Sequence, residues 1–192
     1  MLRALLLLLA LLAAPAQAAP GEVRVLLKTS LGPIVLALET KRAPVTAANF
    51  LKYVDAKRFD GRRFYRAARS RKNPQVGLVQ AGLDHDIAKS FFPIKHEPTS
   101  KTGLRHVDGA ISMARNDPGT AMGDFFICVG DNAYLDARPN YPGYAVFGRV
   151  VSGMPLVRRI LALKTYPGGF SQTTKGQTII AQPVILSARR LP

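Results

Sequence analysis

The sequence is poor in three kinds of residue: cysteine, tryptophan and acidic side chains. Its 192 residues include 1 Cys, 0 Trp and 12 Asp or Glu, against 27 Lys or Arg. A single cysteine, Cys128, cannot form an internal disulfide, so a hydrophobic core has to hold the fold. Cys128 lies in the apolar run FFICVG, which favours a buried side chain over a reactive thiol.

Motifs for metals and for common catalytic chemistries are also missing. The three histidines, His85, His96 and His106, are too far apart along the chain to form a helical metal-binding pair. The sequence has no glycine-rich phosphate loop, no nucleophile elbow and no convincing pair of carboxylates. We therefore expect no metal and no cofactor, and any reaction of this protein should need little proton transfer.

The first 18 residues, MLRALLLLLALLAAPAQA, differ from the rest of the chain. Arg3 precedes an unbroken Leu/Ala run, and Ala16-Gln17-Ala18 matches the A-x-A cleavage signal of secretory signal peptides. The apolar run is too short for a transmembrane helix, which needs about 20 residues. The sequence predicts cleavage after Ala18, a single mature domain over residues 19–192, and a periplasmic or secreted protein.

Basic residues dominate the charge of the chain, which is +15 at pH 7. In a cytoplasmic protein this charge would indicate nucleic-acid binding, but an exported protein rarely meets nucleic acid. We therefore expect no specific nucleic-acid partner. We expect the positive charge to serve solubility or loose association with an anionic envelope surface. The dense run GRRFYRAARSRK, residues 61–72, is compatible with a polyanion patch, a solvated loop or the surroundings of one specialised arginine.

Short apolar runs predict a mostly β chain. Residues 22–39 form a hairpin pattern around the turn Ser30-Leu31-Gly32-Pro33, and residues 182–192 form a closing strand pattern. Two segments, 43–59 and 154–163, have the apolar spacing of amphipathic helices, and Pro44 suits a first helical turn. Five further apolar runs, typical of antiparallel strands, cover residues 62–67, 76–82, 109–115, 124–130 and 143–151. This pattern favours a closed barrel, because closure removes exposed strand edges.

Five ordered blocks carry a resemblance to a known family. FDGRRFYRA, GLVQAG, GAISMAR, DFFICVGDNAYLD and GYAVFGRVVSGM resemble, in this order, the blocks of cyclophilin-type peptidyl-prolyl isomerases, and exported bacterial members most of all. The resemblance implies a mainly β fold, a closed antiparallel eight-stranded β-barrel capped by two α-helices. It also implies a monomeric enzyme that accelerates X-Pro bond rotation in folding envelope or secreted polypeptides, without a cofactor.

The reaction of this family fits a chain without acid/base pairs. X-Pro bonds interconvert over tens to hundreds of seconds, against a barrier of about 20 kcal/mol that amide resonance sets. Resonance is lost in the twisted transition state, so the proline nitrogen becomes a better hydrogen-bond acceptor. A permanently charged arginine beside that nitrogen can stabilise the twisted state without removing a proton.

The resemblance assigns roles to eleven residues of this sequence. Arg66 occupies the position of the catalytic arginine. Gln80 occupies the position of the polar residue that contacts the substrate and orients the arginine. Phe126 would form the floor of the proline pocket. The other substrate-binding positions are Tyr65, Leu78, Ala114, Arg115, Asp124, Tyr134, Leu135 and Tyr144. The rest of the basic run is then expected to be solvated: Arg62, Arg63, Arg69, Arg71 and Lys72.

Several positions depart from the family pattern. Tyr65 and Tyr144 stand where histidines are usual, and Tyr134 replaces a tryptophan, which puts tight cyclosporin binding in doubt. The family's QGG is QAG here. The spacing between Arg66 and Gln80 exceeds the family norm, which predicts an enlarged loop over residues 67–77 near the groove.

Asp124 replaces a glutamine and is the most consequential departure. On an extended strand it shares a face with Phe126, so it should face the groove. An ionised aspartate can only accept hydrogen bonds, whereas glutamine can donate one to a substrate carbonyl. We expect Asp124 to pair with Arg66 or Arg115 and to weaken the site, so that Asp124→Gln would raise kcat/KM.

Two alternatives to an active isomerase stay open at the level of sequence. The first is a cyclophilin-fold peptide-binding chaperone with weak or no isomerase activity. The second is a basic β-barrel that attaches to anionic polymers, for which salt-sensitive retention without isomerase activity would be the signature.

The first testable prediction concerns processing. Because Ala16-Gln17-Ala18 predicts a cleavage site, the protein outside the cytoplasm of its native host should begin at Ala19. Intact-mass analysis of periplasmic and secreted fractions measures this directly. A chain that retains Met1 would contradict the signal peptide and reopen the cytoplasmic, nucleic-acid interpretation.

Overall fold

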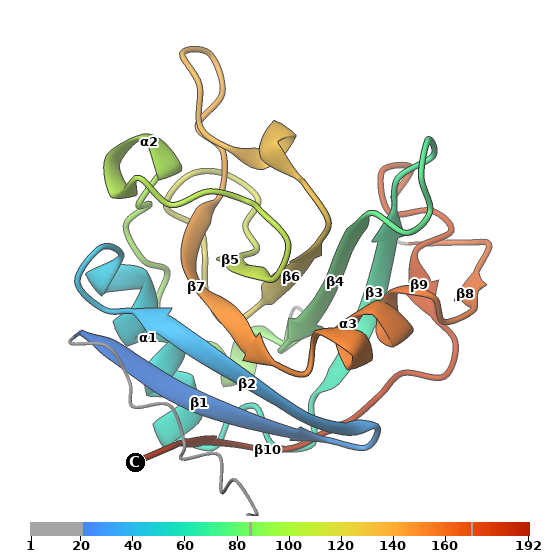
Figure 1. Cartoon of the computed structure of the whole chain (residues 1–192), viewed down its shortest axis with the longest axis horizontal. Helices are drawn as coiled ribbons and strands as arrows, with labels where there is room; N and C mark the ends of the chain where they lie inside the picture. The colour runs from blue at the N-terminus through green and yellow to red at the C-terminus, as the bar shows by residue number, and fades with distance from the viewer. Residues whose placement is uncertain (1–20, 85, 170) are drawn as a thin grey trace, which may run out of the picture.

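The computed structural model describes residues 21–84, 86–169 and 171–192, so the predicted signal peptide lies outside the described residues. These residues form a single antiparallel sheet of ten strands with the order β10-β1-β2-β7-β5-β6-β4-β3-β9-β8 (Figure 1). The strands are β1 Glu22–Thr29, β2 Gly32–Glu39, β3 Arg63–Arg69, β4 Gly77–Gly82, β5 Ala110–Met113, β6 Phe125–Val129, β7 Ala145–Ser152, β8 Thr165–Tyr166, β9 Thr178–Ile179 and β10 Ile185–Arg190. None of the helices in the described part is long and apolar enough to cross a membrane.

In the described part of the chain, three α-helices accompany the sheet: α1 Pro44–Asp55, α2 Thr99–Thr102 and α3 Met154–Leu161. Helix α1 packs against β2, β7 and β10, whereas α3 packs against β2, β3, β4 and β6. The two predicted helices are therefore confirmed, and the single turn of α2 is additional. Two 3₁₀ turns, η1 Ile87–Lys89 and η2 Ala133–Leu135, lie in the connections.

A distant carboxylate stabilises the start of α1. Ala43 offers no capping side chain, and Pro44 occupies the first helical turn, where its missing N–H costs nothing. Glu97 accepts hydrogen bonds from the backbone N–H groups of Val45 and Thr46, at 3.2 and 2.7 Å. A negative charge at this end also complements the helix dipole.

The prediction of a mainly β, antiparallel fold is confirmed, and the described sheet has ten strands where eight were expected. The sequence missed β8 and β9 because strands of two residues have no apolar periodicity. No ladder joins β10 to β8 in the described sheet, but β10 meets the start of β3. Ile185 N–H donates to the Arg62 carbonyl at 2.7 Å, and Gly61 N–H donates to the Ile185 carbonyl at 2.8 Å. One corner is bridged where Arg63 pairs with Val184, and Phe64 N–H donates to the carbonyl of Pro183 at 2.9 Å. Pro183 has no N–H with which to extend this contact.

A cluster of phenylalanines fills the space between α1 and the sheet. Phe50 of α1 lies 5.0 Å from Phe59, 5.2 Å from Phe125 and 5.2 Å from Phe147, measured between ring centroids. All four side chains are fully buried. Cys128 is buried as expected, and burial raises the pKa of its thiol, so it is not a reactive thiolate.

Strand β6 is buried on both of its faces, which explains its unbroken apolar run. Phe125 points into the aromatic cluster, while Phe126, on the opposite face, is only 3% exposed beneath a surface groove. Close approach of β4 fixes the start of this strand. Gly82 has a φ of 131°, and a Cβ there would lie 2.4 Å from the carbonyl oxygen of Gly123 and 2.7 Å from Asp124 Cα.

We expect Gly82→Ala to destabilise the protein more than Gly61→Ala does. Both glycines have positive φ, so alanine costs about 1–2 kcal/mol at either position. Only at Gly82 would the new Cβ also meet backbone atoms, and such overpacking adds about 1–3 kcal/mol. Urea unfolding measures the difference, and equal midpoints for the two variants would contradict the close approach.

Candidate active site

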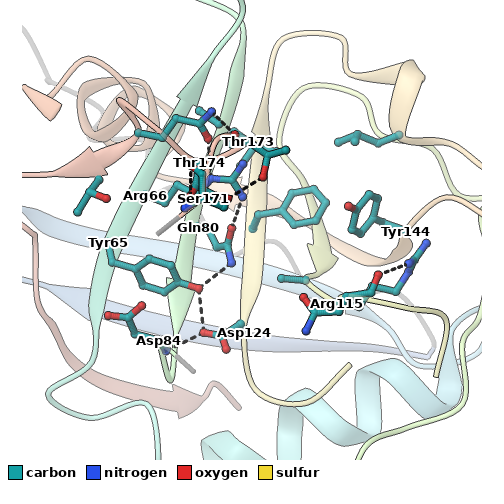
Figure 2. A pocket seen from close by; sticks show the side chains of 18 of the residues that line it. Tyr65, Arg66, Gln80, Asp84, Arg115, Asp124, Tyr144, Ser171, Thr173 and Thr174 are labelled. Carbon is teal, nitrogen blue, oxygen red and sulfur yellow. Dashed lines mark hydrogen bonds between the residues drawn. The ribbon is translucent and has the colours of Figure 1, made fainter. Parts of the chain in front are cut away.

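A groove of about 750 Å³ crosses the surface over β3, β4 and β6 (Figure 2). The structure brings all eleven residues of the predicted site to its walls: Tyr65, Arg66, Leu78, Gln80, Ala114, Arg115, Asp124, Phe126, Tyr134, Leu135 and Tyr144. Their placement together is an observation, whereas their individual roles stay predictions. The other lining residues were not predicted from the sequence; among them are Met122, Ser171, Thr173, Thr174 and Gln177.

One row of paired residues runs across the sheet beneath the groove. Arg66 on β3 pairs with Gln80 on β4, and Gln80 pairs in turn with Phe126 on β6. Directly paired residues in neighbouring strands have side chains on the same face, with Cβ atoms about 5 Å apart. The register therefore places a cation, an amide and an aromatic ring side by side in the groove.

A β-bulge at Tyr65 adds a fourth side chain to this face. Phe64 pairs with Ala81 and Arg66 with Gln80, so Tyr65 is an extra residue on β3. Consecutive side chains of a regular strand point to opposite faces, whereas a bulge redirects one of them. Tyr65 and Arg66 consequently both line the groove, a result that the pattern FYR could not reveal.

The floor of the groove is apolar, and its central ring is packed on two sides. Phe126 stacks on the buried His106 ring, with centroids 5.9 Å apart and planes at 12°, and meets the ring of Tyr144 edge-on at 5.5 Å. His106 is held by Asp136 and Ser112, at 2.7 and 3.0 Å. Burial lowers the pKa of His106, which favours a neutral imidazole under the floor.

Two amide oxygens hold the guanidinium of Arg66. Its Nη1 donates to Gln80 Oε1 at 2.8 Å, and its Nε donates to Gln177 Oε1 at 2.7 Å. Burial lowers the pKa of Arg66, but a guanidinium keeps its proton in proteins. The cation therefore has a fixed position at the edge of the Phe126 floor.

Gln177 is a functional candidate that the sequence did not indicate. It comes from the connection between β8 and β9, and its Nε2 donates to the carbonyl of Thr173 at 2.9 Å. Ser171, Thr173 and Thr174 of the same connection also line the groove (Figure 2). Gln177 is 111 residues from Arg66 along the chain, and no periodicity links positions so far apart.

Among the described residues, Asp124 forms an ion pair with neither Arg66 nor Arg115, so the expected pairing is wrong. Its Oδ1 accepts hydrogen bonds from the Tyr65 hydroxyl at 3.0 Å and from the Asp84 backbone N–H at 2.8 Å. Arg115 instead donates to the carbonyl of Gly143 and lies 4.7 Å from the centre of the Tyr144 ring. The physical reason is the bulge, which brings the Tyr65 hydroxyl within reach of Asp124.

Comparisons with known proteins agree with this geometry. The family model for "Cyclophilin type peptidyl-prolyl cis-trans isomerase/CLD" matches residues 24–187. Peptidyl-prolyl cis-trans isomerase A of Dickeya dadantii (strain 3937) is 38% identical over 171 residues, which cover 88% of this chain and 86% of that protein. Peptidyl-prolyl cis-trans isomerase B of Escherichia coli (strain K12) is 32% identical over 163 residues, with coverages of 83% and 96%.

The chain belongs to the cyclophilin-type peptidyl-prolyl cis-trans isomerases. A crystal structure of a Cryptosporidium parvum cyclophilin type peptidyl-prolyl cis-trans isomerase has the same fold, with a TM-score of 0.68 over 89% of this chain and 98% of that one. The two sequences are 17% identical, so this match concerns the fold alone. In the described part of this cyclophilin, no group of three or more His, Cys, Asp or Glu side chains is placed to hold a metal ion.

The basic run of this cyclophilin is only partly solvated. Arg69 was expected in solvent, but its guanidinium donates to the carbonyls of Leu161 and Leu163, at 2.6 and 2.9 Å, where the carbonyls at the end of α3 lack helical partners. Arg62 forms an ion pair with Asp86 at 3.0 Å. The exposed members are Arg63, Arg71 and Lys72.

The loop between β3 and β4 is shorter than predicted. Strand β3 continues to Arg69 and β4 begins at Gly77, so only residues 70–76 form the connection. Ser70 N–H donates to the carbonyl of Val76 at 2.8 Å, which closes the base of this loop. Ser70 also lines the groove, as expected for a loop near the site.

Proposed function

We propose that this cyclophilin binds an extended peptide in the groove with the proline ring on Phe126 and the imide nitrogen beside Arg66. The twisted state of the peptide bond then receives a hydrogen bond that the planar cis and trans states do not. A contact made only in the transition state raises kcat rather than affinity. Rotation about the bond needs no proton transfer. The groove provides what rotation does need, a cation held in place beside an apolar surface.

The position of Arg66 is the observation that carries this proposal. A guanidinium has five N–H donors, and the two hydrogen bonds to Gln80 and Gln177 use two of them. Three donors are therefore available to a peptide without breaking either bond. Because the site is preorganised, little reorganisation is needed when the imide nitrogen develops its lone pair.

We also propose that the clients are folding envelope or secreted proteins. The predicted signal peptide supports this location, and the net charge of +15 supports loose association with anionic envelope surfaces. We expect the mature protein to act as a monomer, because a single chain brings all eleven residues of the predicted site to its groove and the proposed reaction needs no second copy. The Ala19 N-terminus expected of the exported chain tests the location.

Arg66→Ala is expected to reduce kcat about a hundredfold, the effect of losing a charge-assisted contact of roughly 3 kcal/mol. Arg66→Lys keeps the charge but loses the fork that Gln80 and Gln177 hold, so it should recover only a small part of the loss. An isomerase assay on an Ala-Pro peptide measures both variants, and the KM for the peptide should change much less than kcat.

Arg71→Ala is the matched control, because Arg71 belongs to the same basic run but is exposed and does not line the groove. Its turnover should stay close to that of the parent. Equal losses in Arg66→Ala and Arg71→Ala would show that the run acts as a bulk basic patch. A parent protein that binds the peptide without turnover would instead favour the chaperone alternative.

A further inference from the structure

A chain of hydrogen bonds extends from Arg66 to the backbone at the end of β4. Arg66 bonds to Gln80, Gln80 Nε2 bonds to the Tyr65 hydroxyl at 2.6 Å, and Tyr65 bonds to Asp124 at 3.0 Å. The backbone N–H of Asp84 also donates to Asp124, at 2.8 Å. Figure 2 shows these groups in one continuous line from Arg66 through Gln80 and Tyr65 to Asp124.

The chemistry of the two end groups fixes the direction of every bond in this chain. Arg66 can only donate, so the oxygen of the Gln80 amide has to face it. The amide nitrogen then faces Tyr65 and donates to the hydroxyl oxygen. An ionised Asp124 can only accept, so the hydroxyl proton of Tyr65 points at the carboxylate. Reversal of the Gln80 amide would place an N–H against the guanidinium and break two bonds at once.

Tyr65 suits this intermediate position because it stays protonated. Burial, with the nearby Asp124 carboxylate as a second cause, raises the pKa of the Tyr65 hydroxyl well above its ordinary value. The phenol therefore keeps its single donor at neutral pH. Gln80 is itself only 6% exposed, so an amide without partners here would pay a desolvation penalty.

We infer that Tyr65 and Asp124 are positioning residues, which lock the Gln80 amide with its oxygen toward Arg66 and thereby fix the catalytic guanidinium. This inference rests on the proposed role of Arg66. It assigns a purpose to Tyr65 and Asp124, two residues that depart from the usual family pattern. Asp124 accepts the hydrogen bond, and the β-bulge turns the Tyr65 side chain toward it. The close approach of Gly82 to the Gly123–Asp124 backbone sets the distance between Tyr65 and Asp124.

This role reverses the expected effect of substituting Asp124. A gain from Asp124→Gln was expected because glutamine can donate to a substrate carbonyl and because aspartate was expected to pair with Arg66 or Arg115. The structure does not support the second ground. A neutral amide at this position accepts more weakly than a carboxylate and can turn its N–H toward Tyr65. The Tyr65 hydroxyl would then be free to donate its proton to the Gln80 oxygen instead of to residue 124. The Gln80 amide would no longer be held in a single orientation.

Kinetics of a double-mutant cycle test the inference. Tyr65→Phe should lower kcat about tenfold and Asp124→Asn about threefold, each with KM within about twofold of the parent. Among the described bonds, Asp124 reaches Gln80 through the Tyr65 hydroxyl, so the double variant should lose about tenfold and no more. A product of the two single effects, about 30-fold, would show independent roles and overturn the inference.

Two exposed positions provide chemically matched controls outside the groove. Tyr166→Phe removes the same hydroxyl and Asp117→Asn the same charge, and neither residue lines the groove. Both control variants should keep the turnover of the parent. Thermal unfolding of all variants identifies a purely structural effect, because losses of kcat that follow a fall in Tm would contradict a positioning role.

NMR signals of the Arg66 guanidinium provide a readout that does not depend on turnover. In the parent, Nε–H and Nη1–H are both bonded, so their signals should be resolved and slow to exchange with water. In Tyr65→Phe and in Asp124→Asn the Nη signals should broaden or merge, while Nε–H, held by Gln177, stays protected. Unchanged Nη signals would overturn the inference even if the proposed isomerase role of Arg66 holds, and a parent without turnover would overturn only that role.

Discussion

The register of three neighbouring strands is the constraint on which the site depends. Pairing of Arg66 with Gln80, and of Gln80 with Phe126, aligns one residue from each of β3, β4 and β6 on the same face. A slip of one residue in either pair would turn one of these side chains to the other face of the sheet. The aromatic cluster beneath β6 and the close approach at Gly82 both oppose such a slip.

The groove combines two kinds of surface that the reaction needs at a fixed separation. Its apolar part rests on Phe126, which His106 and Tyr144 hold from below and from the side. Its polar part holds Arg66 between Gln80 and Gln177, so the cation cannot follow the peptide as the bond twists. A cation in a fixed place can distinguish the twisted state from the planar states, whereas a mobile one would bind all of them alike.

Much of the fold could be predicted from the sequence, because the hairpin of β1 and β2 and the helices α1 and α3 have local apolar patterns. Arg66, Gln80 and Phe126 have no such pattern and were assigned through the resemblance of their blocks to cyclophilins. The bulge at Tyr65 could not be predicted, since it is a property of the pairing between two strands. Gln177 and the partners of Asp124 were missed for the same reason: these contacts join segments that no sequence spacing relates.

The most direct test of the account is exchange NMR on an Ala-Pro peptide with a small, substoichiometric amount of the mature protein. The account predicts exchange cross-peaks between the cis and trans proline signals, because uncatalysed rotation takes tens to hundreds of seconds and is too slow to produce them. With Arg66→Lys the cross-peaks should nearly vanish, while the proline ring still broadens on binding. Equal cross-peaks with the parent and with Arg66→Lys, or none with the parent, would contradict the claim that the fixed guanidinium accelerates rotation.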